Sequence, residues 1–234
     1  MTMPPVPPTA LEPVHVVLPM RTVSGGKARL GEALDAEERE ELVLGMLLHT
    51  VQVLGRWDVC GRIHLVSPAP VLDAATRQAG VEVRVHRQVG EGLNAGIALG
   101  ISAARVEGAT SVLVLPGDLP LLDVDSLDQL LLAADAGLAA AAGGSLVTIV
   151  PADAGGGTNA LLLYPPTAIG PAFGPDSFEA HLRAADAAGA AVQVVSGTDL
   201  GFDLDTPDDL ERLEPSRLLA LTGLGRAAAD EVGV

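Results

Sequence analysis

The chain has 234 residues, of which 48% are hydrophobic and only 2% aromatic, and its formal net charge is −16. This length predicts one domain, and the apolar share is enough for a sizeable core built from aliphatic side chains. The strong negative charge argues against nucleic acid and anionic membrane surfaces as partners. A single cysteine, Cys60, cannot form an internal disulfide, so the expected compartment is the cytoplasm.

Both ends of the chain are predicted to lie outside the domain. The proline-rich start, residues 1–13, lacks the basic region and the apolar core of a secretory signal, so we expect it to be disordered. The end, residues 226–234, is expected to be disordered as well. The uncharged, largely apolar run at residues 136–152 is interrupted by Gly143-Gly144, so we expect no membrane-spanning helix. These limits leave residues 14–225 as a single domain.

Short β-rich runs alternate along the chain with amphipathic stretches. Seven runs are predicted as strands: Val14–Pro19, Arg62–Ser67, Val81–His86, Ser111–Leu115, Ser145–Val150, Ala160–Tyr164 and Val192–Ser196. Helix starts are expected at the capping box Asp35–Glu38, at Asn94, at Asp125 or Ser126, and at the capping box Asp176–Glu179. This alternation is typical of a mostly parallel sheet with helices on both faces.

The loop after the first predicted strand is unusually basic. Arg21, Lys27 and Arg29 fall within it, and Lys27 is the only lysine in the protein. With Gly25-Gly26 beside them, these side chains and the loop amides could wrap a polyphosphate. The loop matches neither a Walker A sequence nor the G-x-G-x-x-G fingerprint. We therefore interpret it as an anion-binding loop, with a solvated basic turn as the alternative.

The segment SVLVLPGDLPLLD, residues 111–123, places Asp118 shortly after the fourth predicted strand. In open α/β sheets, ligands bind at the carboxyl ends of the strands. Asp118 is therefore a candidate metal ligand, and a polar turn residue is the alternative.

Two glycine-rich turns follow, and each leads into a regular element. Residues 155–157 are three glycines that precede Thr158 and Asn159 at the start of a strand, and Gly174 and Ser177 stand at the start of a helix. Hydroxyls and backbone amides in such turns can bind a phosphate or a carboxylate. Ordinary turn and capping chemistry is the alternative.

The segment GFDLDTPDDLERL, residues 201–213, begins a helix at Thr206 and Pro207, which are favoured start residues. Helix initiation does not explain Asp203 and Asp205, which alternate on the extended chain before it. Together with Asp118, these carboxylates would form an oxygen-rich site suited to Mg²⁺. An acidic surface loop is the alternative.

The histidines carry less information. His15 and His64 are expected as hydrogen-bonded core residues of strands, whereas His181, which follows the helix start at Asp176, could face a pocket. The sequence contains no Ser/His/Asp arrangement and no Cys/His spacing typical of a metal site.

Taken together, these stretches resemble the family of 2-phospho-L-lactate guanylyltransferases, enzymes of deazaflavin coenzyme F-420 biosynthesis that include bacterial phosphoenolpyruvate guanylyltransferases. The resemblance covers residues 14 to about 213, and its most specific parts are GGTNALLL, FGPDSFEAH and DLDTPDDL, supported by KARL, EGLNAGI and LPGDLPLL. It implies a three-layer αβα, Rossmann-like nucleotide-diphospho-sugar-transferase fold. It also implies transfer of GMP from GTP to a phospho-acid, with release of pyrophosphate.

The resemblance also implies a role for each candidate residue. The triphosphate of GTP would be held by Arg21, Lys27 and Arg29, and the guanosine by Glu91, Leu93 and Asn94. Magnesium would be held by Asp118 and Asp205, with Asp203 as a further candidate. The phospho-acid would be held by Thr158, Asn159, Gly174 and Ser177. The expected catalytic residues are Lys27, Asp118 and Asp205.

The acceptor stays open among phosphoenolpyruvate, 2-phospho-L-lactate and 3-phospho-D-glycerate, because only one or two pocket contacts distinguish them. The alanine-rich, arginine-for-lysine composition suggests a GC-rich bacterial genome and favours phosphoenolpyruvate. Two rival functions are a nucleotidyltransferase of the same fold acting on a molybdopterin or sugar phosphate, and an inactive nucleotide-binding regulatory module. No nucleic-acid or membrane partner is expected, and a homodimer is common in enzymes of this kind.

Overall fold

The computed structural model describes residues 9–20, 27–68, 80–88, 92–142 and 144–232. Within these residues seven strands form one sheet in the order β3-β2-β1-β4-β6-β5-β7. Their bounds are β1 Val14–Pro19, β2 Cys60–Ser67, β3 Val83–Arg87, β4 Ser111–Val114, β5 Leu146–Pro151, β6 Thr158–Tyr164 and β7 Ala191–Val194. Neighbouring strands are parallel, except that β6 runs antiparallel to β4 and β5. The sheet is therefore mostly parallel, as the sequence predicts.

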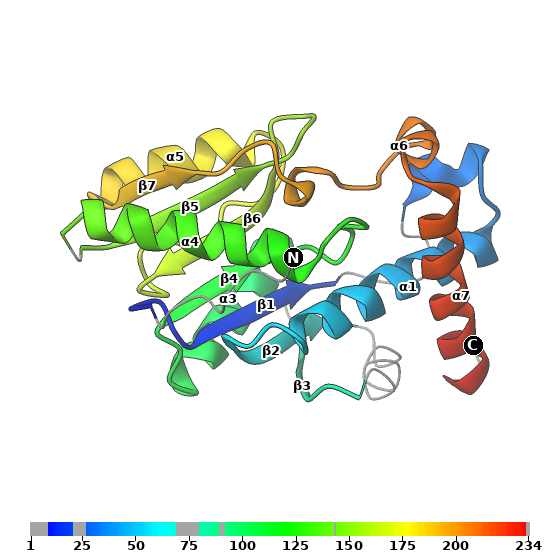
Figure 1. Ribbon diagram of the computed structural model, residues 1–234, viewed down its shortest axis with the longest axis horizontal. Coiled ribbons are helices and arrows are strands. Elements are labelled where there is room, and N and C mark those ends of the chain that lie inside the picture. The colour runs from blue at the N-terminus through cyan, green and yellow to red at the C-terminus, as the bar shows by residue number, and fades with distance from the viewer. Residues whose placement is uncertain (1–8, 21–26, 69–79, 89–91, 143, 233–234) are drawn as a thin grey trace.

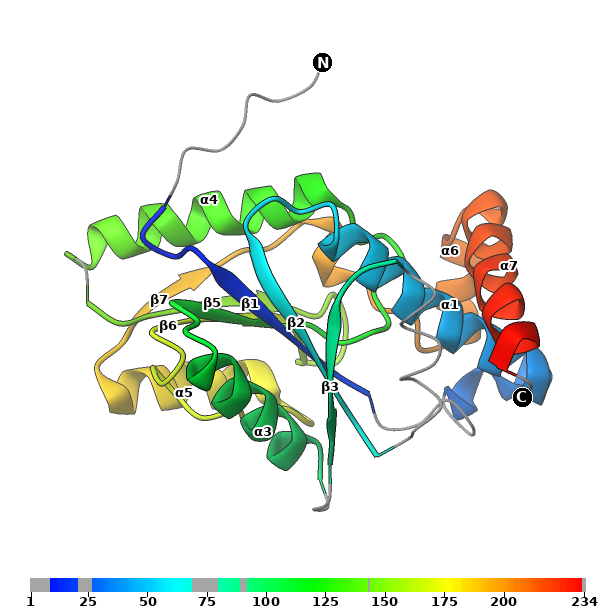
Figure 2. The same cartoon turned by 90° about the horizontal axis from the view of Figure 1, so that it is seen from below.

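Helices cover both faces of the sheet (Figure 1). The α-helices are α1 Ala36–Leu54, α3 Leu93–Val106, α4 Val124–Ala140, α5 Ser177–Ala188, α6 Pro207–Arg212 and α7 Pro215–Val232, and the 3₁₀ helices are η1 Ala28–Glu32 and η2 Asp199–Gly201. One apolar cluster joins the sheet to α1 and α4, and a second joins its other face to α3 and α5 (Figure 2). Val16 and Leu18 of β1 belong to the first cluster and Val17 to the second, which explains why this strand is apolar throughout.

Local capping signals predict some helix starts and miss others. Asp35 begins α1 with the expected capping box, since its carboxylate accepts from the Glu38 N–H and the Glu38 carboxylate accepts from the Asp35 N–H. Helix α3 begins after Gly92, so the cap predicted at Asn94 is wrong. Helix α4 begins after Asp123 rather than at the predicted Asp125 or Ser126, because the Asp123 carboxylate accepts from both the N–H and the hydroxyl of Ser126.

The capping box predicted at the start of α5 is absent. Asp176 has a left-handed backbone with a φ of 54°, and its side chain makes no capping hydrogen bond. Backbone bonds hold the first turn instead, because the Ser177 N–H donates to the Gly174 carbonyl and the Phe178 N–H to the Gly156 carbonyl. The second bond ties this helix to the glycine-rich turn before β6.

Both ends of the described chain are more ordered than the composition indicates. Leu11 is fully buried, although residues 1–13 are expected to be disordered, and residues 1–8 lie outside the described part. Helix α7 continues through Arg226 to residue 232, so the disordered tail predicted from residue 226 is wrong over that stretch. Figure 1 shows α7 beside α1, where the Arg226 guanidinium donates to both carboxylate oxygens of the buried Glu41 at 2.7 and 2.9 Å.

The histidines predicted for the core, His15 and His64, are buried and hydrogen-bonded. Hydrogen bonds of 3.0 Å join the ring of His64 to those of His15 and His86. Burial lowers the pKa of His64 to about 4, so this ring is neutral near pH 7. Burial also raises the pKa of the Cys60 thiol to about 12, which makes it unreactive. Among the described residues, no helix combines the length and the apolar character needed to span a membrane.

Candidate active site

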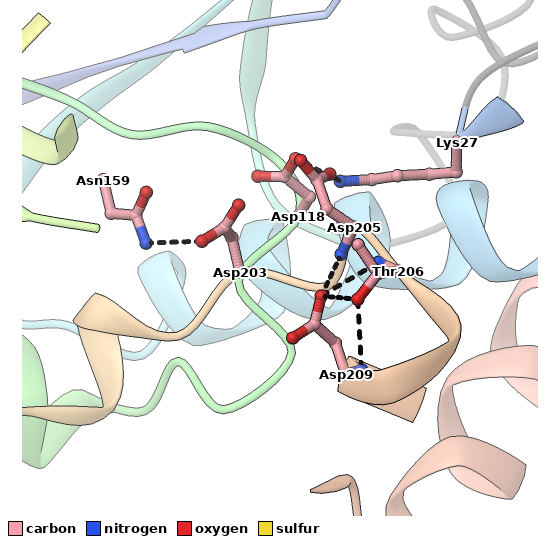
Figure 3. A network of polar contacts seen from close by, with 7 residues as sticks. All are labelled: Lys27, Asp118, Asn159, Asp203, Asp205, Thr206 and Asp209. Carbon is pink, nitrogen blue, oxygen red and sulfur yellow. Dashed lines mark hydrogen bonds and ion pairs between the residues drawn. The ribbon is translucent and has the colours of Figure 1, made fainter. Parts of the chain in front are cut away.

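The carboxyl ends of β1 and β4, which are neighbours in the sheet, carry the central residues of the site (Figure 3). β4 leads through a short turn to Asp118, and Lys27 stands after β1 at the start of η1. The extended segment before α6 supplies Asp203 and Asp205. The Leu204 N–H within that segment donates to the Asp118 carbonyl over 3.2 Å. This backbone bond brings two segments together that are far apart in the sequence.

The side chain of Lys27 lies between two carboxylates. Its Nζ is 2.5 Å from Asp118 Oδ2 and also donates to Asp205 Oδ1, and the side chain is only 11% exposed. Burial alone would lower the pKa of Lys27, but the two carboxylates raise it above its ordinary value. Its backbone is left-handed, with a φ of 52°, a region that is costly for a residue other than glycine and is often found at functional sites. Lys27 is therefore a firmly held, charged ammonium.

Asp203 belongs to the same group but points another way (Figure 3). Its Oδ1 accepts from Asn159 Nδ2 at 3.3 Å, and that amide also donates to the Gly201 carbonyl at 2.8 Å. Burial and the charges of Asp118 and Asp205 raise the pKa of Asp203, while the hydrogen bond from Asn159 acts against them. The three carboxylates therefore repel one another, and a bound cation would stabilise this arrangement.

Asp209 holds Asp205 in place. Its Oδ2 accepts from the Asp205 N–H at 3.1 Å, from the Thr206 N–H at 2.9 Å and from the Thr206 hydroxyl at 2.8 Å. Burial raises the pKa of Asp209, but these hydrogen bonds together lower it by more than burial raises it. The pKa of Asp209 is therefore below its ordinary value. Thr206 thus begins α6 as predicted, and its capping partner also positions Asp205, a candidate metal ligand.

The donor set fits magnesium. Mg²⁺ binds through one or two carboxylates together with substrate phosphates, and Asp118 and Asp205 are two carboxylates that already share one cation. Asp203, the further candidate, contacts Asn159 instead. Among the described residues, no group of three His, Cys, Asp or Glu side chains is arranged to hold a metal ion. A magnesium ion at Asp118 and Asp205 would therefore need phosphate oxygens to complete its coordination.

Two cavities meet at these carboxylates. The first has a volume of about 590 Å³ and is lined by Lys27, Met20 and Met46, among others. The second has a volume of about 610 Å³ and is lined by the turn before β6 and by the start of α5. Six residues line both cavities: Arg29, Leu93, Pro116, Asp118, Phe173 and Asp205. Because the carboxylates lie on this common wall, molecules bound in the two cavities would meet there.

Most of the candidate residues that the sequence singles out lie at these cavities. The residues of the predicted phospho-acid site, Thr158, Asn159, Gly174 and Ser177, all line the second cavity.

Asn94, a predicted guanosine contact, hydrogen-bonds to the backbone of Phe173. Its Nδ2 donates to the Phe173 carbonyl at 2.9 Å and its Oδ1 accepts from the Phe173 N–H at 2.8 Å. The amide therefore ties α3 to the loop before α5. Two other candidates, Arg21 and Glu91, lie outside the described residues.

Two residues of the site, Phe173 and Arg212, were not predicted from the sequence. Phe173 lies on the common wall of the cavities, edge-on to the His181 ring, with 4.8 Å between the ring centroids. Arg212 lines the second cavity and lies over the Phe202 ring, 4.6 Å from its centroid. The available signals were their positions, because Phe173 is the first residue of the motif FGPDSFEAH and Arg212 lies two residues after DLDTPDDL. His181, which could have faced the pocket, is instead fully buried.

Comparison with known proteins identifies the family. A family model described as "Guanylyl transferase CofC like" matches residues 14–214. The chain belongs to this guanylyl transferase family. It is 42% identical over 203 residues to the phosphoenolpyruvate guanylyltransferase of Rubrobacter xylanophilus, covering 87% of this chain and 94% of that protein. It is 33% identical over 201 residues to the 3-phospho-D-glycerate guanylyltransferase of Phenylobacterium zucineum, covering 83% of this chain and 87% of that protein.

Solved structures with low sequence identity share the fold. A protein of Desulfovibrio desulfuricans G20 described as a nucleotide-diphospho-sugar transferase has a TM-score of 0.70 at 17% identity, over 94% of this chain and 98% of that one. A 4-diphosphocytidyl-2C-methyl-D-erythritol synthase has a TM-score of 0.57 at 15% identity, over 88% of this chain and 97% of that one. The predicted Rossmann-like, nucleotide-diphospho-sugar-transferase fold is therefore confirmed. Together with the family, it makes the protein a nucleotidyltransferase.

Proposed function

We propose that the protein transfers GMP from GTP to a small phospho-acid, with release of pyrophosphate, in the biosynthesis of the deazaflavin coenzyme F-420. The acceptor that we expect is phosphoenolpyruvate, which relatives in Rubrobacter xylanophilus and Sphaerobacter thermophilus carry in their names. The observation that carries the proposal is the meeting of two cavities at Asp118, Asp205 and Lys27. The expected compartment remains the cytoplasm, which the single cysteine supports.

We assign the first cavity to GTP. Its volume of about 590 Å³ lies in the ordinary range for small-molecule sites. Lys27 lines it, and Arg29 lines the wall that it shares with the second cavity. Both cations are suited to phosphate oxygens, because hydrogen bonds between charged partners are the strong ones. The α-phosphate would then lie near the common wall, where the acceptor can reach it.

We assign the second cavity to the phospho-acid. Thr158 and Ser177 offer hydroxyls there, and Arg212 adds a positive charge. The Arg212 guanidinium lies 3.6 Å from an oxygen of Asp209 and 3.9 Å from one of Asp153, which are loose ion-pair distances. Within the described part of the chain, no hydrogen bond from Arg212 accompanies these contacts. Its N–H groups are therefore available to the carboxylate of an acceptor.

The reaction needs charge neutralisation more than a proton acceptor. The acceptor phosphate is already ionised at neutral pH, so its attack on the α-phosphate requires no general base. The main barrier is the repulsion between two anions, which Lys27 and Arg29 would offset. A magnesium ion held by Asp118 and Asp205 would supply further positive charge at the same place.

Pyrophosphate release from GTP in the presence of Mg²⁺ tests the proposal, with ATP and CTP as nucleotide controls. Phosphoenolpyruvate, 2-phospho-L-lactate and 3-phospho-D-glycerate are offered singly. Release that requires GTP and one of these acceptors supports the proposal and identifies the substrate. An absence of pyrophosphate release with all three would refute the phospho-acid assignment. Molybdopterin and sugar phosphates would then be tested as acceptors. Binding of GTP without turnover of any acceptor would instead favour a regulatory module.

A further inference from the structure

A buried histidine behind the second cavity has no part in the reaction proposed above. His181, on α5, is fully buried, and its two ring nitrogens face different partners. Nδ1 lies 3.0 Å from the hydroxyl oxygen of Thr158, and Nε2 lies 3.0 Å from the backbone nitrogen of Ala172. Thr158 lines the second cavity, and Ala172 precedes Phe173 on the common wall. His181 therefore connects two parts of the site from behind.

The two contacts determine the tautomer of His181. A backbone N–H can only donate, so Nε2 must present a lone pair to accept from Ala172. Burial lowers the pKa of His181 to about 4, so the ring is neutral near pH 7 and carries a single N–H proton. That proton is on Nδ1, and Nδ1–H donates to the hydroxyl oxygen of Thr158.

This donation directs the hydroxyl proton of Thr158 away from His181. Within the described residues, no oxygen accepts a hydrogen bond from this hydroxyl, and Thr158 lines the second cavity. An anion bound there would be its acceptor. We propose that His181 is a positioning residue that orients the Thr158 hydroxyl as a hydrogen-bond donor to the phospho-acid. The inference rests on the function proposed above for the same site.

The same ring also supports the wall between the two cavities. It accepts from the Ala172 N–H and contacts the edge-on ring of Phe173, whose backbone makes two hydrogen bonds with the Asn94 amide. A histidine suits this place because it is rigid and carries a donor and an acceptor on different edges of the ring. A single side chain thus orients a substrate donor and fixes the wall beside it.

Two amide substitutions separate the two contacts of His181. In His181→Gln the longer side chain can reach the position of Nε2 and accept from Ala172, but the donor to Thr158 is lost. In His181→Asn the shorter side chain places its amide near the position of Nδ1 and keeps that donor. Thr158→Val removes the hydroxyl at nearly constant volume and serves as the reference for a lost substrate contact.

We expect His181→Gln and Thr158→Val each to lower kcat/KM for the phospho-acid roughly tenfold, because a hydrogen bond to a charged group is lost. The KM for GTP should stay unchanged, and His181→Asn should retain most of the activity. The kcat/KM of the double variant His181→Gln/Thr158→Val should be no lower than that of Thr158→Val alone, because His181 acts through Thr158. Additive losses, an unchanged kcat/KM in His181→Gln, or equal losses in both amide variants would overturn the inference.

A magnetic-resonance measurement tests the tautomer without any activity assay. In wild-type protein labelled with ¹⁵N-histidine, the His181 signals near neutral pH should show a protonated Nδ1 and an unprotonated Nε2. The opposite tautomer, or a doubly protonated ring, would overturn the inference even in an active enzyme. If the wild-type enzyme released no pyrophosphate with any of the three phospho-acids, the proposed function would be refuted, and with it the substrate role of Thr158. The tautomer of His181 could still be measured in that case. The two failures are therefore distinguishable.

Discussion

The contact of Lys27 with two carboxylates leads to a prediction about magnesium binding. Lys27→Met removes the ammonium but keeps an unbranched side chain of similar length. The ammonium lies 2.5 Å from Asp118, also contacts Asp205, and belongs to a side chain that is 11% exposed. It therefore neutralises much of the negative charge that would otherwise attract a divalent cation. Without it, the same oxygens become available to Mg²⁺.

The size of the effect follows from the charges and their exposure. Two unit charges about 4 Å apart interact by about 4 kcal/mol at an effective dielectric constant of about 20. The side chains of Asp118 and Asp205 are 29% and 45% exposed, so solvent screening reduces the contribution of the ammonium to about 1–2 kcal/mol. Lys27→Met should therefore bind Mg²⁺ about tenfold more tightly than the wild type, since about 1.4 kcal/mol is a factor of ten. Guanylyl transfer should nevertheless fall roughly 100-fold, because a cation at the triphosphate is lost.

Isothermal titration calorimetry with magnesium chloride on the nucleotide-free proteins measures the affinity directly. Asp118→Asn is the matched control, because it removes a ligand instead of the competing cation and should weaken Mg²⁺ binding. An affinity in Lys27→Met equal to or below that of the wild type would refute the reasoning that Lys27 and magnesium use the same two carboxylates.

Four further outcomes are expected. Asp118→Asn should reduce pyrophosphate release at least roughly 1000-fold while leaving the urea midpoint close to that of the wild type, because its side chain lies on a cavity wall; near-normal turnover would exclude the metal role. Arg212→Met should raise the KM for the phospho-acid about tenfold and leave the KM for GTP unchanged, because a charge-assisted hydrogen bond is lost; equal changes in both would contradict the assignment of the second cavity. Arg226→Met should lower the free energy of unfolding by about 2 kcal/mol, a value between those of buried and exposed ion pairs, because Glu41 is buried and Arg226 is largely exposed. Adding Glu41→Gln should recover part of this loss, and unchanged urea midpoints would show that the pair does not stabilise the contact of α7 with α1. Because the pKa of His64 is lowered from 6.5 to about 4 in the folded state, its neutral form contributes stability above pH 6.5 that is lost as the pH falls towards 4. His64→Gln should flatten this slope in a series of urea titrations, and an unchanged slope would assign it to other groups.

The sequence by itself determined the alternation of strands and helices, and with it the edge of the sheet at which the site lies. Asp118 was predictable because the carboxyl ends of parallel strands share one edge, where ligands bind. The caps at Asp35 and Thr206 were predictable because each depends on a partner three residues away, a distance over which the local chain alone sets the geometry. The αβα layers follow from the same alternation and from the apolar strands.

Only the tertiary structure decided which of these groups meet. Lys27 contacts Asp205 but Asp203 turns to Asn159, although the two aspartates are separated by a single residue. Such choices depend on contacts between segments far apart in the sequence, and the direction of a side chain at such a contact is set by packing that no local pattern records.

The end of the chain illustrates the same limit. No local sequence pattern predicts a helix at residues 226–232, yet these residues continue α7. The buried carboxylate of Glu41 on α1 supplies the partner for Arg226, and the neighbouring helix supplies the surface on which α7 packs. An isolated helix of this length is marginal in water, so its stability comes from a partner that only the folded protein brings into contact.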